Sequence, residues 1–136
     1  MNYLLDTNAV ISHLRSGGKS GVSRQLRAVT PADVAVCSVV RAELVYGANR
    51  SANPAKNLAQ VQTFLAPFTS FPFDDPAADI YGQIRAGLDA TGLSIGPNDL
   101  MIAAIAVTHG LTLVTHNTAE FGRVPGMRIE DWEATP

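Results

Sequence analysis

The feature that most constrains the fold of this chain is an alternation of short apolar runs with longer helical stretches. The runs at 34–38 and 111–115 are almost uniformly apolar, as expected of strands buried on both faces. Strands that alternate with helices predict a parallel sheet covered by helices on both sides. We therefore expect an α/β fold, a three-layer α/β/α sandwich with a mostly parallel sheet. Strands are predicted at 2–6, 34–38, 69–73 and 111–115, with helices at 8–15, 22–29, 39–49, from 54, 75–92 and 100–109, and a last strand within 127–132.

Length and charge limit the class of protein further. A chain of 136 residues is most simply one domain, here 1–136. The net charge of −2 hides a polarity, because residues 1–68 carry +4 and residues 69–136 carry −6. The first residues do not resemble a signal peptide, and no apolar run approaches the roughly 20 residues of a membrane span. We therefore expect a cytoplasmic protein that does not enter a membrane.

Oxygen-bearing side chains fall where a parallel sheet gathers its functional groups. Asp6 ends the first predicted strand, and Glu43 lies about one turn into the helix after the second. Asp99 lies in the first turn of a later helix, and Asn117 follows the last long strand. Binding sites in open parallel sheets form outside the carboxyl ends of the strands. The four side chains are therefore predicted to meet at one edge of the sheet.

Carboxylates that meet in apolar surroundings need a compensating charge. Their desolvation and mutual repulsion favour a divalent cation, and an all-oxygen ligand set selects Mg²⁺ or Mn²⁺. Such an ion polarises a phosphodiester and lowers the pKa of an attacking water. Purely structural roles stay open at this stage. Asp6 and Asp99 are also plausible helix caps, Glu43 a partner of Arg41 or Arg50, and Asn117 a turn residue.

Four segments resemble the motifs of PIN domains in order and spacing. The similarity extends over essentially the whole chain, and the compact length and tail are most similar to the VapC toxins of VapBC toxin–antitoxin pairs. The segments are 4–8 (LLDTN), 41–44 (RAEL) with 46–47 (YG), 98–103 (NDLMIA), 113–121 (LVTHNTAEF), and the tail 124–132 (VPGMRIEDW).

This resemblance implies a Mg²⁺-dependent endoribonuclease, with Mn²⁺ as a possible substitute. Carried over by motif, the catalytic set is Asp6, Glu43, Asp99 and Asn117, with Asp6 and Asp99 as the direct metal ligands. Many relatives have aspartate where this chain has Asn117, which removes one charge from the site. Glu120 is three residues further along and is expected to face solvent rather than replace the missing carboxylate.

The resemblance also implies partners. Toxins of this kind are neutralised by a cognate VapB-type antitoxin, which lays a helix or an extended segment in a hydrophobic groove, and they form homodimers. The substrate would be RNA, contacted by scattered arginines. Because the fourth acid is absent, a non-catalytic PIN-like module that binds RNA or protein is the alternative.

Overall fold

The computed structural model describes residues 1–133, and its strands form one five-stranded sheet. All four strand pairings are parallel, which confirms the predicted α/β class and the strand in the tail. Residues 134–136 of the predicted domain lie outside the described residues. The strands are β1 (Tyr3–Leu5), β2 (Val34–Cys37), β3 (Thr69–Phe71), β4 (Thr112–Val114) and β5 (Ile129–Glu130).

Helices occupy the stretches between the strands, as the sequence predicts. Two short elements were not predicted: a 3₁₀ turn at Pro31–Asp33 and the four-residue helix α7. Both are too short to show helical periodicity. The helices of residues 1–133 are α1 (Thr7–Arg15), α2 (Gly21–Ala28), α3 (Ser38–Asn49), α4 (Pro54–Leu65), α5 (Asp75–Ala90), α6 (Pro97–Thr108) and α7 (Thr118–Phe121).

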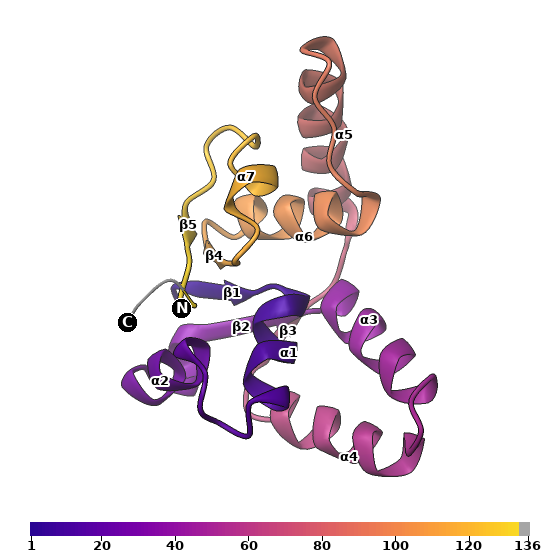
Figure 1. Cartoon of the computed structure of the whole chain (residues 1–136). Coiled ribbons are helices and arrows are strands. Elements are labelled where there is room, and N and C mark those ends of the chain that lie inside the picture. The colour runs from indigo at the N-terminus through magenta and orange to yellow at the C-terminus, as the bar shows by residue number, and fades with distance from the viewer. Residues whose placement is uncertain (134–136) are drawn as a thin grey trace.

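The sheet has the strand order β3-β2-β1-β4-β5, so the chain changes direction once. It moves from β1 to β2 to β3, and then crosses back to the other side of β1 to form β4 and β5. Right-handed crossovers in opposite directions place α1–α4 on one face and α5–α7 on the other (Figure 1). The point of reversal, between the carboxyl ends of β1 and β4, is where ligands bind in folds of this type.

The core consists of the central strands and α6. Every residue of Val34–Cys37 is fully buried, and α6 is buried on nearly all sides from Leu100 to Ala106. Cys37 is fully buried, and burial raises the pKa of its thiol, as expected of an inert core residue. Within residues 1–133 no helix combines the length and apolar character needed to cross a membrane.

Two helices are capped by the aspartate that precedes their first residue. α1 begins at Thr7, one residue before the predicted start, and α5 begins at Asp75 as predicted. Asp6, which the sequence left open as a helix cap, is the N-cap of α1, and Asp74 is the N-cap of α5. In each case the carboxylate accepts the backbone N–H three residues ahead. The first of these caps matters most, because its carboxylate lies directly at the end of β1.

Candidate active site

Asp6 lies at the reversal point of the sheet and is only 4% exposed. Its backbone N–H donates to the carbonyl of Val114 on β4 at 3.1 Å, and its Oδ1 accepts the N–H of Ala9 at 2.8 Å. Burial raises the pKa of Asp6, and the charges of Glu133 and Glu43 add to the rise. Asp6 therefore caps α1 and also faces other acids.

Thr115, directly after β4, supports Asp6 and Asn117 together. Its side chain is buried, and its hydroxyl donates to the Asp6 carboxylate, which opposes the rise in pKa. The same Oγ1 accepts the backbone N–H of Asn117 at 3.0 Å. Thr115 was not among the residues predicted from the sequence, although a polar side chain directly after an apolar strand is a detectable signal.

Glu43 reaches the site from α3, across the sheet edge from Asp6. The hydroxyl of Thr7 donates to Glu43 Oε1 at 2.6 Å and links α3 to α1. The alternative interpretation, a partner among Arg41 and Arg50, is wrong within the described residues, because no ion pair joins Glu43 to either. Glu43 is half-buried and directed toward the other carboxylates.

Asp99 is the third residue of α6 and does not cap that helix; the N-cap is Gly96, which has no side-chain cap. The pKa of Asp99 rises to about 6. Burial is the largest cause, followed by repulsion from Glu120, Glu43 and Asp6. Because the charges of these three acids raise the pKa of Asp99, all four carboxylates lie close to one another.

Glu120 is half-exposed, but both of its carboxylate oxygens are hydrogen-bonded to protein groups, which corrects the expectation that it faces only solvent. Its Oε1 accepts the N–H of Gly96 at 2.8 Å, and its Oε2 accepts Asn117 Nδ2 at 2.6 Å. These two hydrogen bonds, a third from protonated Asp99 and the nearby Arg123 lower the pKa of Glu120. Glu120 is therefore the fourth carboxylate, and the amide of Asn117 holds it in place.

A charge-neutral substitution of Glu120 should be visible at Asp99. In the variant Glu120→Gln an acceptor for Gly96 remains, but the repulsion that raises the pKa of Asp99 is removed. We expect the pKa of Asp99 to fall below about 6 but to stay above its ordinary value of 3.8, because burial remains; carboxyl carbon NMR during a pH titration measures it. Asp79→Asn, which removes an exposed acid of α5, is the matched control. An unchanged Asp99 titration in Glu120→Gln would contradict the assignment.

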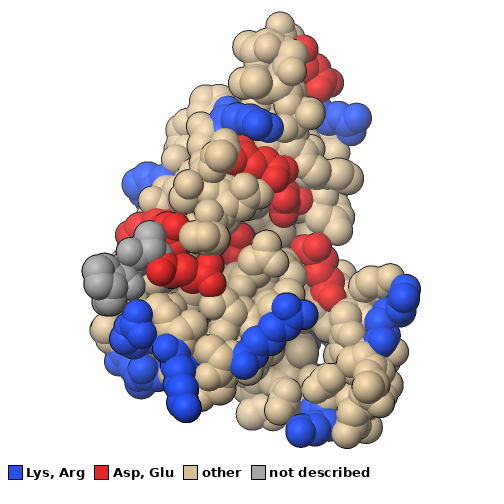
Figure 2. All heavy atoms as spheres, in the orientation of Figure 1, with Lys and Arg blue, Asp and Glu red and all other residues tan. Residues whose placement is uncertain are grey.

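Asp6, Glu43 and Asp99 line a cleft of about 560 Å³ at the sheet edge, whereas Asn117 and Glu120 are not among its lining residues. Figure 2 shows acidic side chains gathered across the middle of the molecule, with most of the lysines and arginines over the half formed by α1–α4. The cleft has a donor set of carboxylate oxygens with raised pKa values at Asp6 and Asp99. Such a set fits Mg²⁺ or Mn²⁺, because a divalent cation relieves the repulsion. The cleft is lined by Asp6, Thr7, Asn8, Ile11, Ala42, Glu43, Tyr46, Asn98 and Asp99.

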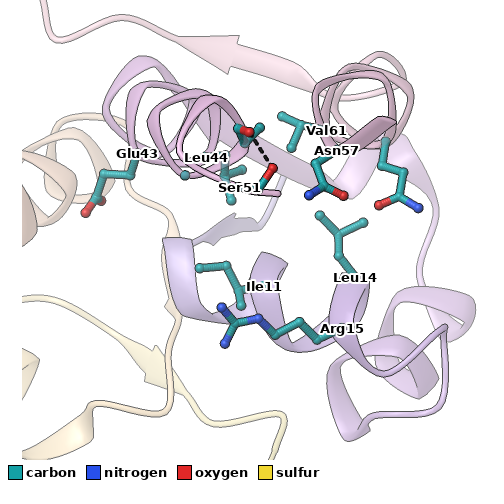
Figure 3. A pocket seen from close by; sticks show the side chains of 11 residues that line it. Ile11, Leu14, Arg15, Glu43, Leu44, Ser51, Asn57 and Val61 are labelled. Atoms are coloured by element: carbon teal, nitrogen blue, oxygen red, sulfur yellow. Dashed lines mark hydrogen bonds between the residues drawn. The ribbon is translucent and has the colours of Figure 1, made fainter. Parts of the chain in front are cut away.

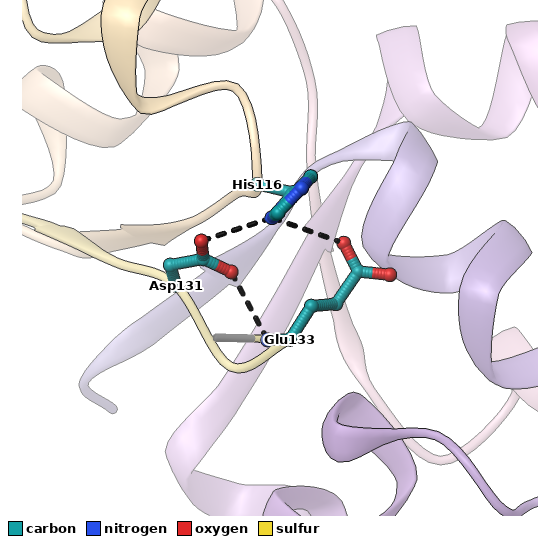
Figure 4. A group of neighbouring side chains, drawn as sticks. All are labelled: His116, Asp131 and Glu133. Carbon is teal, nitrogen blue, oxygen red and sulfur yellow. Dashed lines mark hydrogen bonds and ion pairs between the residues drawn. The ribbon is translucent and has the colours of Figure 1, made fainter. Parts of the chain in front are cut away.

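Residues 131–133 and His116 lie beside Asp6 at this site. His116 Nδ1 lies 2.9 Å from Asp131 Oδ2 and 3.6 Å from Glu133 Oε2 (Figure 4). The two acids flank Trp132, which is 4% exposed and packs edge-on against Tyr3 with ring centroids 5.1 Å apart. A buried tryptophan thus anchors the tail, and the hydrogen bond and charge of Asp131 raise the pKa of His116.

Comparison with known proteins finds relatives over nearly the whole chain. The model of the PIN domain family matches residues 3–127. The chain is 39% identical over 132 residues to the tRNA(fMet)-specific endonuclease VapC of Salmonella typhimurium, covering 97% of this chain and 98% of that protein. It is 34% identical to ribonuclease VapC2 of Rickettsia felis, covering 98% and 99%. A crystal structure of DNA-bound VapBC from Salmonella typhimurium superposes with a TM-score of 0.91 at 39% identity, covering 97% and 98% of the two chains.

Proposed function

This chain belongs to the PIN domain family, and we propose that it acts as the ribonuclease toxin of a toxin–antitoxin pair. The observation that carries the proposal is the meeting of four carboxylates, Asp6, Glu43, Asp99 and Glu120, at the reversal point of a parallel sheet. Full-length relatives named as VapC ribonucleases support it. These relatives favour a ribonuclease over a non-catalytic binding module. Glu120, which accepts a hydrogen bond from the Asn117 amide, supplies a carboxylate beside the position where Asn117 replaces an acid, and this also favours a ribonuclease.

The metal would be Mg²⁺, or Mn²⁺, held by Asp6 and Asp99. Both are acids whose pKa is raised by burial and by neighbouring charge, so both gain most from a bound cation. Such a cation would polarise the phosphodiester and lower the pKa of the attacking water. Glu43 and Glu120 complete the ligand set or hold water next to it. Asn117 contributes by fixing Glu120 at 2.6 Å.

The protein groups would handle the proton of the attacking water. Glu43 or Asp99 would orient and deprotonate that water, which then attacks phosphorus in line with the departing 3′ oxygen. Before a cation binds, the pKa of Asp99 is about 6, which is closer to neutral pH than the pKa of an ordinary aspartate. A general base works best when its pKa lies near the working pH. The short hydrogen bond from Thr7 fixes one oxygen of Glu43 and leaves the other available.

The substrate would be RNA, and transfer RNA is the first class to test because the Salmonella relative is named for it. The acidic cleft repels phosphate, so attraction must come from its surroundings. The half formed by α1–α4 supplies most of the positive charge, with Arg15, Arg24, Arg27, Arg41 and Arg50. We expect binding that weakens steeply as salt rises.

The direct test is cleavage of purified transfer RNA by the isolated protein. With Mg²⁺ or Mn²⁺ we expect internal cuts, and with EDTA none. Cleavage that persists in EDTA at the same rate would contradict the metal mechanism. RNA binding without cleavage in either metal would instead establish the binding module.

A groove beside the acidic cleft suits the antitoxin. It has a volume of about 320 Å³ and an apolar floor that includes Ile11, Leu14, Leu44 and Val61 (Figure 3). Ile11 and Glu43 line both the groove and the acidic cleft. A VapB-type segment lying in the groove would therefore reach the acids, where a basic side chain would pair with them.

Blocking this groove should separate toxin activity from neutralisation. Gly47 lies in the groove wall on α3, and a Cβ added there would meet no atom within 4 Å. We expect Gly47→Gln to fold normally, to cut RNA at the wild-type rate and to bind the antitoxin at least about tenfold more weakly. Gly47→Ala is the matched control, because it adds helix propensity with little bulk. Wild-type inhibition of Gly47→Gln by the antitoxin would place the antitoxin elsewhere.

The homodimer, the cytoplasmic location and the single domain over 1–136 stay predictions. The first follows from the resemblance to VapC toxins, and sedimentation of the purified chain measures it directly.

A further inference from the structure

Among the phenylalanine, tyrosine and tryptophan side chains of residues 1–133, Tyr46 alone is exposed, with 63% of its surface open to solvent. All other phenylalanine, tyrosine and tryptophan side chains of this part are buried or half-buried. Tyr46 lies three residues after Glu43 on α3, a spacing that places both on one helix face. It also lines the acidic cleft. An exposed aromatic ring thus stands at the rim of the proposed catalytic site.

Arg50, the C-cap residue of α3, contacts this ring from one turn further along the chain. Its Nη1 donates to the Tyr46 hydroxyl at 2.9 Å, and its guanidinium carbon lies 5.7 Å from the ring centroid. The phenol therefore has a polar partner although the ring itself stays open to solvent. A flat apolar surface next to a fixed positive charge matches a nucleotide, which has a flat base and an anionic phosphate.

We infer that Tyr46 is a substrate-positioning residue, which stacks on an unpaired RNA base next to the phosphodiester in the acidic cleft. Arg50 would contact a neighbouring phosphate. The inference rests on the proposed ribonuclease function and adds how the substrate is held. The carboxylates of the cleft repel the phosphates of an RNA chain, so groups at its rim are needed to align the substrate. Stacking supplies it without demanding a particular base, because every base has an aromatic face.

The position of Tyr46 favours RNA over a protein partner. Its neighbours on α3, Leu44, Gly47 and Ala48, line the apolar groove, whereas Tyr46 lines the acidic cleft. The ring thus projects on the side where the phosphodiester would lie. A protein segment in the groove would contact mainly the side of α3 that carries Leu44, Gly47 and Ala48.

The test measures binding with cleavage prevented. A fluorescent single-stranded RNA of 12 mixed nucleotides and an abasic ribose–phosphate chain of the same length are titrated with protein in EDTA. We expect the wild-type protein and Tyr46→Phe to bind the RNA about tenfold more tightly than the abasic chain. Tyr46→Leu should bind both probes alike, because leucine keeps apolar bulk and lacks the ring.

Two controls separate base stacking from a general loss of apolar surface or of stability. Leu93→Ala, which removes an exposed apolar side chain that does not line the cleft, should retain the base preference. Thermal unfolding should give the same midpoint for Tyr46→Leu as for the wild type. A full base preference in Tyr46→Leu, or none in the wild type, overturns the inference. So does unchanged RNA binding with weakened antitoxin binding, which would assign the ring to the protein partner.

The binding and cleavage assays test the stacking inference and the ribonuclease proposal separately. A wild-type protein that prefers bases in EDTA but cuts no RNA with Mg²⁺ or Mn²⁺ would contradict the ribonuclease proposal alone. A protein that cuts RNA and shows no contribution from Tyr46 would contradict the stacking alone.

Discussion

Replacing Asp6 with asparagine is expected to lower the rate of RNA cleavage by about 100-fold or more while leaving the fold intact. The variant removes the charge of a proposed metal ligand, and a factor of 100 corresponds to about 2.7 kcal/mol of transition-state stabilisation. Asparagine caps a helix as well as aspartate does, so the hydrogen bond from Ala9 at 2.8 Å is retained. Asp6→Asn therefore separates the chemical role from the capping role.

The comparison with alanine makes that separation measurable. Asp6→Ala loses both the charge and the helix cap. We expect its free energy of unfolding to be about 1 kcal/mol lower than that of Asp6→Asn. Both should cut transfer RNA equally slowly in single-turnover assays with Mg²⁺. Wild-type cleavage by Asp6→Asn together with slow cleavage by Asp6→Ala would mean that Asp6 acts only as a cap.

Replacing Asp99 with asparagine is expected to have opposite effects on activity and on stability. Cleavage should fall by about 100-fold or more, because a second proposed metal ligand is lost. The metal-free protein should become more stable above pH 6, because an ionised carboxylate that three others repel is replaced by a neutral amide. A stabilising substitution that destroys activity is typical of a site whose charges are held together for function.

The direction of the pH effect follows from the pKa of Asp99. That pKa is about 6 in the folded protein and 3.8 ordinarily, so the folded state binds more protons between pH 4 and 6. Wild-type stability in EDTA should therefore fall as pH rises through this window and stay at the lower level above it. Because Asp99 is half-exposed, solvent screening reduces the difference to about 1 kcal/mol.

Chemical denaturation at pH 5 and pH 7.5 measures this difference. In EDTA, Asp99→Asn should exceed the wild type at pH 7.5 and approach it at pH 5. Added Mg²⁺ should stabilise the wild type and leave Asp99→Asn nearly unchanged, because a ligand that binds only the folded state raises its stability. Lower stability of Asp99→Asn at pH 7.5 in EDTA would show that repulsion at Asp99 is not the dominant charge effect.

The sequence was sufficient for the layers of the fold because each depends on short-range patterns. The apolar run Val34–Cys37 and the nearly all-apolar α6 predict a strand and a helix buried on both sides, and both are buried. The carboxyl ends of parallel strands share an edge, so Asp6, Glu43 and Asp99 could be placed together without coordinates. Their catalytic roles remain predictions.

Side-chain directions required the tertiary structure, because they depend on segments far apart in the chain. Glu120 is directed inward by the N–H of Gly96, 24 residues earlier, and Glu43 is held by Thr7, 36 residues earlier. No local pattern encodes such a contact. The exposure of Tyr46 has the same origin, because it depends on which distant segments pack against α3 and which side of the helix they leave uncovered.

The sequence by itself therefore determined the α/β class, the parallel sheet and the edge at which three acids meet. These follow from hydrophobic periodicity, which acts over a few residues. Only the tertiary structure decided that the chain reverses between β1 and β4, that Glu120 is the fourth acid, and that Asn117 holds it. Strand order and side-chain direction are set by packing between distant segments. That packing brings the acidic side chains close enough together to form one site.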